Sequence, residues 1–296
     1  MLPQRNLLVR LAYLGTPFAG WQRQKELPSV QGLLEATIER ITGEPSRVIG
    51  AGRTDRGVHA LGQACNVHTS ARISPLSLQQ ALNALLPPTV RVWLVEEVPS
   101  VFHARRNALG KAYLLVLWTD PLMSPFLFGR ITHQPSTCDW ERVRRALPNL
   151  LGEHDFRAFA KAGSYKGGTI RQIHRAELIG KPPLVALLFS GNGFLQHMIR
   201  ALAGTLLMIG QGRREEEWLR SLLLGADRSS AGPTLEAEGL YLLAVHYTEK
   251  ELSSEIAVTN PFTLSSIFPL LLPCTADLQA RMGTEQTSGQ SAHLFP

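Results

Sequence analysis

Hydrophobic and polar positions along the first hundred residues follow two different periods. Short apolar runs that end at Gly, Pro or Thr are typical of strands, and they predict strands at 7–13, 47–51, 58–68 and 90–98. Apolar residues at helical spacing predict one helix after Ser29 that ends at Gly43. The same spacing predicts a second helix at 77–86, which Pro87 and Pro88 end.

The two periods continue in the rest of the chain. They predict strands at 111–118, 169–178, 184–190 and 240–247, and helices at 138–147 and 194–209. Strands with interspersed helices indicate an α+β fold, with mainly antiparallel sheets flanked by helices. Pro99 and the FHARR segment separate two such sets. We therefore expect two domains, 1–105 and 106–248.

Residues 249–296 differ in composition from the rest. They are rich in Ser, Thr, Gly, Gln and Pro, with one short apolar patch. Such segments bury too little apolar surface to offset the entropy lost on ordering. We expect a C-terminal extension that is partly disordered.

Composition and charge are those of a globular protein with an anionic partner. Hydrophobic residues make up 44% of the chain and charged residues 18%, and the formal net charge of +6 favours a polyanion such as RNA. Cys65, Cys138 and Cys274 form no CxxC pair, which argues against disulfides and structural zinc and fits a reducing cytosol. The N-terminus lacks signal-peptide features, and no apolar run approaches the roughly 20 residues that span a bilayer. We expect a cytoplasmic protein.

A charged loop between two predicted strands is the first candidate site. Gly52 and Gly57 bracket Arg53, Asp55 and Arg56. Glycine permits the tight or left-handed backbone that lifts a loop from a sheet and lets a ligand approach. Two flanking arginines would keep the carboxylate ionised, as a nucleophile or general base requires. A solvated turn with a local Asp hydrogen bond would have the same sequence.

The predicted helix 194–209 carries a single arginine in an apolar sequence. His197, Arg200 and Gly204 share one face of this helix. An arginine is costly to bury unless a carboxylate or phosphate meets it, and Asp55 is the obvious candidate. The alternatives are an Arg200 whose stem lies along the surface and a His197 that only packs.

Aromatic and basic residues also occur together. Tyr113 could stack on an unpaired base while Lys111, on the same strand face, holds a phosphate. A core tyrosine would give the same pattern. The segments around Trp21 and around Phe102 with Arg105 could follow an RNA backbone or form a solvated basic rim.

Motifs for metals and nucleotide cofactors are missing from the sequence. There is no HExxH, no Walker A loop and no GxGxxG, and His154-Asp155 is a lone pair. We therefore expect neither a metal nor a cofactor.

Ten segments, in this order, carry a resemblance to a known family. They are YLGTPFAGWQRQ (13–24), VQGLLE (30–35), GRTDRGVHALGQ (52–63), NALLP (83–87), FHAR (102–105), KAY (111–113), GEHDFRAF (152–159), TIRQI (169–173), GFLQHMIR (193–200) and EGLYL (238–242). Together they resemble the TruA family of tRNA pseudouridine synthases, over most of the chain. The GRTDxGVHA loop is the most specific of them.

The resemblance implies roles for four residues. Asp55 would be the catalytic aspartate and Arg200 its ion-pair partner, Tyr113 would pack on the target base, and Arg53 would fill the space that the flipped base leaves. Further candidate substrate-binding residues are Lys111, Arg105, His59 and Leu240.

The resemblance also implies an overall arrangement and a substrate. It implies the pseudouridine synthase fold, with an active-site cleft between two domains, and a homodimer without cofactor or metal. The substrates would be tRNA uridines on the 3′ side of the anticodon stem-loop (positions 38–40). Residues 234–237 depart from the family pattern, which usually has a proline there, so the pocket wall near Leu240 is expected to differ.

Alternatives remain at this point. Asp55 could act as a nucleophile at the base or the ribose, or as a base at the ribose C2′. A tRNA-binding protein with an inactive site would need the same basic and stacking residues. A metal-dependent phosphohydrolase using Asp55, His59 and His154 is a third class.

Overall fold

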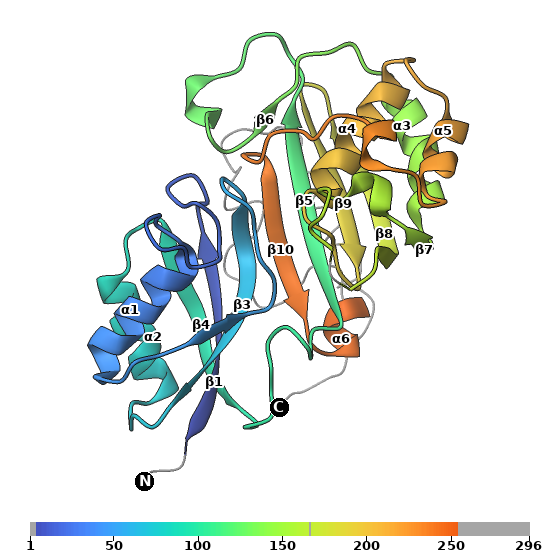
Figure 1. Cartoon of the computed structure of the whole chain (residues 1–296). Helices are drawn as coiled ribbons and strands as arrows, with labels where there is room; N and C mark the ends of the chain where they lie inside the picture. Colours follow the sequence, from blue (N-terminus) through green and yellow to red (C-terminus); the bar gives the residue numbers. More distant parts are fainter. Residues whose placement is uncertain (1–3, 166, 254–296) are drawn as a thin grey trace, which may run out of the picture.

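The computed structural model describes residues 4–165 and 167–253 (Figure 1). Its strands are β1 (Arg5–Tyr13), β2 (Val48–Gly50), β3 (His59–Thr69), β4 (Val90–Val98), β5 (Gly110–Trp118), β6 (Thr132–His133), β7 (Gly152–Asp155), β8 (Ile170–Lys181), β9 (Leu184–Gly191) and β10 (Leu240–His246). Its α-helices are α1 (Val30–Thr42), α2 (Pro75–Leu85), α3 (Trp140–Ala146), α4 (Met198–Gly210), α5 (Glu216–Leu222) and α6 (Glu249–Ser253). Within these residues, no helix has the length and apolar character needed to cross a membrane.

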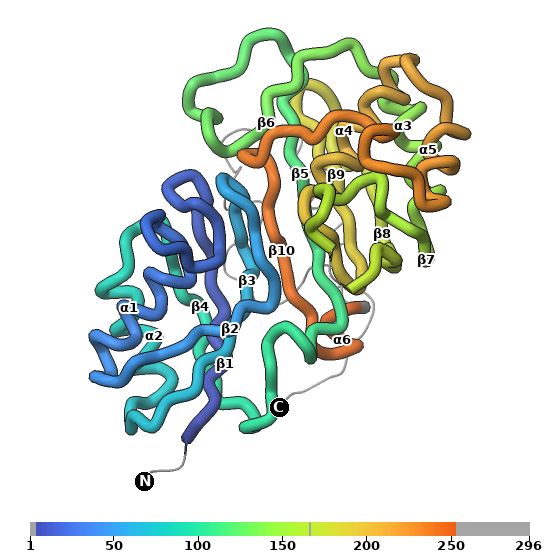
Figure 2. The backbone as a smooth tube through the Cα atoms, in the orientation of Figure 1, coloured from blue at the N-terminus to red at the C-terminus, as the bar shows by residue number. Residues whose placement is uncertain are grey.

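All ten described strands belong to one sheet. Their order is β4-β1-β3-β10-β5-β9-β8-β7, with β2 beside β3 and β6 beside β5. Among the described strands, β3 with β10 and β5 with β6 pair parallel, and the other pairs are antiparallel. This confirms the predicted α+β class. The two halves of the chain lie on either side of β10 (Figure 2), and their division into domains at residue 105 stays a prediction.

The two faces of the sheet carry different apolar clusters. Because successive strand residues point to opposite faces, Tyr113 and Leu187 lie in the cluster that also contains the apolar residues of α4. Leu114 and Leu188 lie in the second cluster, with Leu127 from the connection between β5 and β6. Helix α4 therefore covers the face of β5 on which Tyr113 lies.

The helix ends test the sequence predictions directly. The side chain of Ser29 accepts a hydrogen bond from the Gly32 amide at 3.3 Å. Gly43 ends α1 in a left-handed conformation at φ 74°, so both predicted ends are confirmed. The predicted start of α4 at residue 194 is wrong. The helix begins at Met198, because His197 is left-handed at φ 68° and cannot continue a right-handed helix backwards.

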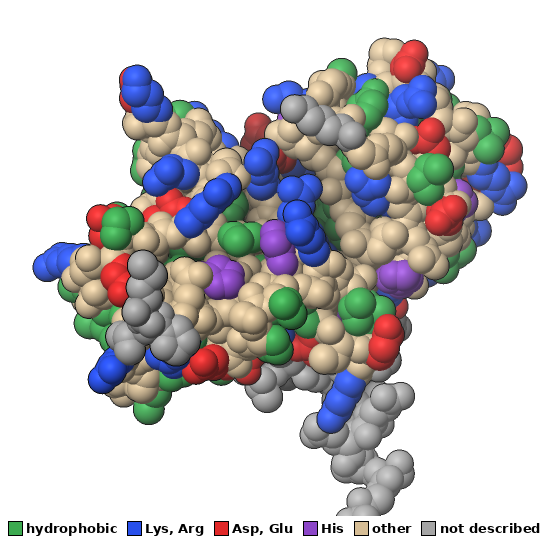
Figure 3. Space-filling model, turned by 60° about the horizontal axis from the view of Figure 1, so that its bottom comes forward, with side chains coloured by type: hydrophobic (Ala, Val, Ile, Leu, Met, Phe, Trp, Pro, Cys, Tyr) green, Lys and Arg blue, Asp and Glu red, His purple; other side chains and the backbone are tan. Residues whose placement is uncertain are grey.

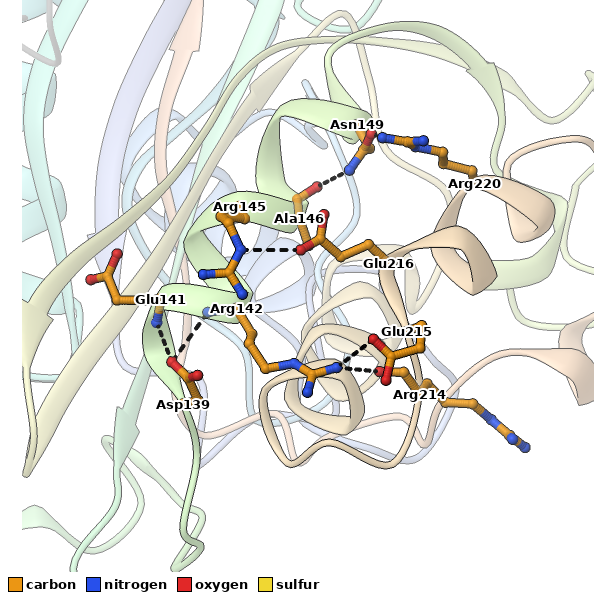
Figure 4. Close-up of polar contacts among 10 residues, drawn as sticks. All are labelled: Asp139, Glu141, Arg142, Arg145, Ala146, Asn149, Arg214, Glu215, Glu216 and Arg220. Atoms are coloured by element: carbon orange, nitrogen blue, oxygen red, sulfur yellow. Dashed lines mark hydrogen bonds and ion pairs between the residues drawn. The ribbon is translucent and has the colours of Figure 1, made fainter.

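Polar contacts join α3 and the short helix α5, which the sequence did not predict (Figure 4). Arg142 meets Glu215 at 2.7 Å and Arg145 meets Glu216 at 3.4 Å. Arg220 donates to the Asn149 side chain at 2.9 Å. These exposed pairs each contribute little free energy, so they set the orientation of α5 more than its stability.

A buried arginine joins α6 to the opposite half of the sheet. Arg10 on β1 meets Glu251 at 2.6 Å, and their side chains are 8% and 21% exposed. The guanidinium also donates to the Val245 carbonyl at 3.3 Å. It lies over the rings of Trp93 and Tyr247, at 5.9 and 5.5 Å from their centroids. The chain therefore folds back on β1 and β4 before residue 254. Residues 249–253 of the predicted extension form a helix, and residues 254–296 lie outside the described residues.

Replacing Glu251 with Ala should destabilise the protein. The substitution leaves the buried Arg10 without its carboxylate, so we expect the free energy of unfolding to fall by about 3 kcal/mol. Urea denaturation followed by tryptophan fluorescence measures this change. Glu249→Ala, at an exposed position of the same helix, is the matched control and should change the value by less than about 0.5 kcal/mol. Equal losses in the two variants would contradict a stabilising role for the Arg10–Glu251 pair.

Candidate active site

Contacts with β1 and with the segment that follows it fix the conformation of the loop between β2 and β3. The Thr54 hydroxyl lies 2.8 Å from the Tyr13 hydroxyl, and the Thr54 carbonyl accepts a hydrogen bond from the Trp21 amide at 3.1 Å. The Val58 amide donates to the Asp55 carbonyl at 3.2 Å, which closes a turn. Asp55 thus lies at the tip of the loop, and the residue before it, Thr54, is buried.

The side chain of Asp55 meets three side chains from the start of α4. Its Oδ1 accepts a hydrogen bond from the Gln196 amide at 3.0 Å. Its Oδ2 lies 3.7 Å from His197 Nε2 and 3.9 Å from an Arg200 terminal nitrogen. The sequence-based pairing of Asp55 with Arg200 is therefore matched in space, at a distance longer than a direct hydrogen bond.

Arg200 is positioned by the segment that precedes β10. Its Nε donates to the Leu235 carbonyl at 2.5 Å, and its own carbonyl accepts from the Leu235 amide at 3.3 Å. Gly204 allows this approach, because a Cβ there would lie 2.0 Å from the Pro233 carbonyl oxygen. Burial lowers the pKa of Arg200, whereas the negative charge of Asp55 raises it. Segment 234–237, where the sequence predicts a different pocket wall, thus holds Arg200 through main-chain atoms.

His197 has the one positive φ found among non-glycine residues in the described part of the chain. Such backbone strain persists where the surroundings enforce it, often at functional sites. Burial lowers the pKa of His197; Asp55 raises it, while Arg200, Lys161 and Arg228 lower it. Burial is the largest of these effects, so the imidazole beside Asp55 takes up a proton less readily than a free histidine.

Tyr113 lies on β5 below the same loop. It is 7% exposed, and its ring meets Phe194 edge to face, with centroids 5.3 Å apart. Burial raises the pKa of the hydroxyl, and the nearby charge of Asp55 raises it further, so the phenol is neutral. Tyr113 therefore brings an uncharged aromatic ring close to the carboxylate.

Lys111 also lies beside the loop, two residues before Tyr113. Its Nζ is 3.1 Å from the position that a Cβ on Gly52 would take. Burial lowers the pKa of Lys111 to about 8, helped by the positive charges of Arg105 and Arg171. Among the described residues, its side chain has neither a hydrogen bond nor an ion pair.

His59 and Leu240 are both part of the interior. His59 Nδ1 accepts from the Gly15 amide at 3.0 Å, and Nε2 donates to the Glu238 carbonyl at 2.9 Å. The imidazole stacks on Tyr241 with centroids 4.7 Å apart, and burial lowers its pKa. Both ring nitrogens are thus used within the protein. Leu240, 6% exposed, opens β10 opposite β5.

The remaining predicted residues lie on the surface or elsewhere. Arg53 and Arg105 are exposed. His154 makes its contacts elsewhere: its Nε2 donates a hydrogen bond to the Leu151 carbonyl at 2.8 Å, and its ring packs against Phe156. The structure does not bring Asp55, His59 and His154 into one cluster, and no group of three His, Cys, Asp or Glu within residues 4–165 and 167–253 could hold a metal.

Gln196 is the residue that the sequence reasoning missed. Its carbonyl accepts from the Lys161 amide at 2.9 Å, so the main chain is fixed while the amide side chain reaches Asp55. The segment was interpreted as helical from residue 194, which hid this non-helical approach. The glycine pair Gly191 and Gly193 just before it was the available signal for a loop.

The molecular surface is hollowed between the two halves of the chain (Figure 3). Lys and Arg side chains gather around this hollow, with histidines beside it (Figure 3). The arrangement places an anionic carboxylate, a neutral aromatic ring and unpaired cations together, which suits chemistry on part of a polyanion.

Comparison with known proteins adds independent evidence. A family model described as tRNA pseudouridine synthase matches residues 11–105 and 146–248. The tRNA pseudouridine synthase A of Methylacidiphilum infernorum is 41% identical over 238 residues, which are 80% of this chain and 93% of that protein. The protein of the same name from Leptospira biflexa is 42% identical over 253 residues, covering 84% and 95%.

Similarity to solved structures is weaker. A crystal structure of a Cbf5-Nop10-Gar1 complex matches with a TM-score of 0.38 and 11% identity. The match covers 69% of this chain and 45% of that chain, so the chain spans less than half of its length. A likeness of this size carries no weight for the fold.

The two matched ranges contain both the Asp55 loop and the start of α4, which meet in the structure. Together with relatives that this chain covers almost end to end, they establish that the chain belongs to the TruA family of tRNA pseudouridine synthases, which are isomerases.

Proposed function

We propose that this protein isomerises uridine to pseudouridine on the 3′ side of the tRNA anticodon stem-loop. It does so without a cofactor, as a homodimer in the cytoplasm. The observation that carries the proposal is the convergence of Gln196, His197 and Arg200 on the carboxylate of Asp55. The printed names of the relatives support the tRNA substrate.

The reaction requires three operations on one nucleotide. The N1 to C1′ bond breaks, the uracil turns while bound, and C5 joins C1′. The C5 hydrogen leaves to solvent as a proton and N1 takes up another, so no net group is gained or lost and the oxidation level does not change. A carboxylate of fixed orientation is therefore sufficient as the reacting protein group. Asp55 acts as a nucleophile at the base or ribose, or as a base at C2′. Gln196 and His197, just before α4, and Arg200 in α4 hold it in place.

Access to the uridine requires base flipping, which costs a few kcal/mol for unstacking. Tyr113 offers an aromatic face that packs on the extruded uracil, and stacking of this kind offsets part of the cost. Arg53 is exposed two residues before Asp55 and fills the space that the base leaves. Lys111 and Arg105 contact the RNA backbone. His59, with both nitrogens bonded internally, and Leu240 shape the pocket wall.

Asp55→Asn should abolish isomerisation. The substitution keeps the shape of the side chain and removes its charge, so we expect a loss of at least about 10³-fold in kcat. Tritium release from anticodon-arm tRNA labelled at uridine C5 measures it. tRNA affinity should stay within a few-fold of wild type. Continued isomerisation by Asp55→Asn would contradict the catalytic role of Asp55. If the wild-type protein binds tRNA without turnover, the protein is a tRNA-binding protein and not an enzyme.

Arg200→Lys should lower kcat while leaving tRNA affinity largely intact. Lysine keeps a positive charge but cannot reach Asp55 and the Leu235 carbonyl at once, as the guanidinium does. We expect about a 10²-fold loss in kcat, from single-turnover kinetics. Arg220→Lys, which changes an exposed arginine on α5, is the control. An effect on binding alone would contradict the positioning role.

Gln196→Ala should have a smaller effect on the same step. Losing one hydrogen bond to a carboxylate is worth about 1.5 kcal/mol, which corresponds to roughly a tenfold fall in kcat. Gln196→Glu places a second negative charge beside Asp55 and should be worse than Ala. The ranking of the two variants in the tritium-release assay tests this. Equal activity of wild type and both variants would exclude Gln196 from the site.

A further inference from the structure

Three cations from separate elements border the candidate site. Lys111 belongs to β5, Arg171 to β8, and Arg105 to the connection between β4 and β5. Lys111 Nζ lies 3.1 Å from the Cβ position of Gly52, and Arg171 Nε lies 3.8 Å from that of Gly193. Lys111 and Arg171 therefore lie next to the two chain segments that deliver Asp55 and Gln196, and the charge of Arg105 is near enough to act on Lys111. We call them the three-cation site.

No carboxylate compensates these charges among the described residues. Lys111 has no polar partner there, and the Arg105 side chain makes neither a hydrogen bond nor an ion pair. The Arg171 guanidinium donates only to main-chain carbonyls, those of Gly168 at 3.4 Å and Ile170 at 2.5 Å. Some arginines elsewhere on the surface do meet acids, as Arg142 and Arg145 of α3 meet Glu215 and Glu216.

Such a cluster is unfavourable in the protein alone. Like charges in a partly buried place repel each other and lose hydration, which is why burial, Arg105 and Arg171 together lower the pKa of Lys111 to about 8. Burial likewise lowers the pKa of Arg171. The cost is recovered when an anion binds between the three groups, so the cluster indicates a ligand with negative charge.

Extruding a nucleotide brings the two phosphates that flank it closer together, because the backbone bulges outward. The repulsion between these two phosphates adds to the cost of unstacking. Cations at the bulge offset it, and arginine and lysine suit the task differently: the guanidinium fork grips two oxygens, and the ammonium acts as a point charge. Gly52 and Gly193 let the Lys111 and Arg171 side chains lie close to the main chain here, since neither glycine carries a side chain.

We propose that Arg105, Lys111 and Arg171 together bind the phosphates on either side of the extruded uridine. The inference rests on the proposed function, because it needs a flipped nucleotide whose base lies at Tyr113 and Asp55. It adds Arg171 to the substrate-binding residues and assigns the three cations one ligand, a pair of phosphodiester groups.

The salt dependence of tRNA binding tests how many phosphates the three cations contact. Equilibrium binding of anticodon-arm tRNA is measured from 50 to 300 mM KCl, by filter binding or fluorescence anisotropy. Removing one phosphate contact with Lys111→Gln should weaken binding about tenfold and reduce the slope of log K against log[salt] by about 0.7 to 0.9. Arg171→Gln should act in the same way. Lys181→Gln, at the exposed end of β8, should leave both values unchanged.

The pH dependence of binding tests Lys111 in particular. Its pKa is about 8 in the free protein, and a bound phosphate favours the charged form, so the pKa is higher in the complex. Affinity is therefore greatest below about pH 8 and falls as the pH rises to 9, by up to about tenfold per pH unit. Lys111→Arg keeps its charge throughout this range and should show no such fall. The same RNA in both titrations removes contributions from other titrating groups.

The outcomes separate this proposal from the proposed function. Unchanged salt slopes for Lys111→Gln and Arg171→Gln, or the same pH response in wild type and Lys111→Arg, would overturn the three-cation site. Isomerisation by wild type, and its loss in Asp55→Asn, would still stand. A wild-type protein that never isomerises tRNA would instead overturn the proposed function. Circular dichroism spectra of each variant show whether a loss reflects misfolding, and Lys111→Arg, which keeps size and charge, remains informative if Lys111→Gln does not fold.

Discussion

The short parallel pairing of β3 with β10 sets the distance between the two parts of the candidate site. Only Tyr241 with His59 and Leu242 with Ala60 are paired, and His59 follows the Asp55 loop almost directly. The His59 ring adds a stack on Tyr241 and hydrogen bonds at both nitrogens. A shift of one residue in this register would turn every side chain of β10 to the other face. The contact between Asp55 and Arg200 depends on this register.

Arg200 is held in a way that depends little on nearby side chains. Within segment 234–237, the groups that hold it are the main-chain carbonyl and amide of Leu235. Main-chain hydrogen bonds need a backbone path and depend little on the side chain. The path itself requires Gly204, where any side chain would collide with Pro233. The steric constraint therefore falls on Gly204 of α4 more than on the side chains of segment 234–237.

Features set by local chemistry were predictable from the sequence. Helix α1 follows from Ser29, the helical apolar spacing and Gly43, all within one segment. Strands β1, β5 and β9 follow from apolar runs that the sheet buries on both faces, and β4 follows from an apolar run that is only partly buried. Strand β7 was missed, because its four residues, Gly152–Asp155, are mostly polar at the edge of the sheet. The start of α4 was misplaced because contacts with Asp55 and Lys161, distant in sequence, hold the Gln196–His197 backbone in a non-helical form.

The site was partly predictable for a related reason. The cost of burying Arg200 indicated a carboxylate partner, and Asp55 lies 3.9 Å away. Gln196 could not be predicted, since an exposed amide is ordinary on any surface. The isolation of Lys111 from acidic groups was equally hidden, because it depends on which strands become neighbours. Composition gives the sum of the charges, and only the fold shows which of them lack partners.

The position of β10 in the chain has a consequence for biosynthesis. Residues 240–246 fill the gap between β3 and β5, and they are made after every other segment that contributes to the site. A nascent chain on the ribosome, surrounded by tRNA, therefore carries the Asp55 loop and α4 well before these can be brought to their final separation. The sheet and the site are completed in the same step, when the strand between the two halves docks.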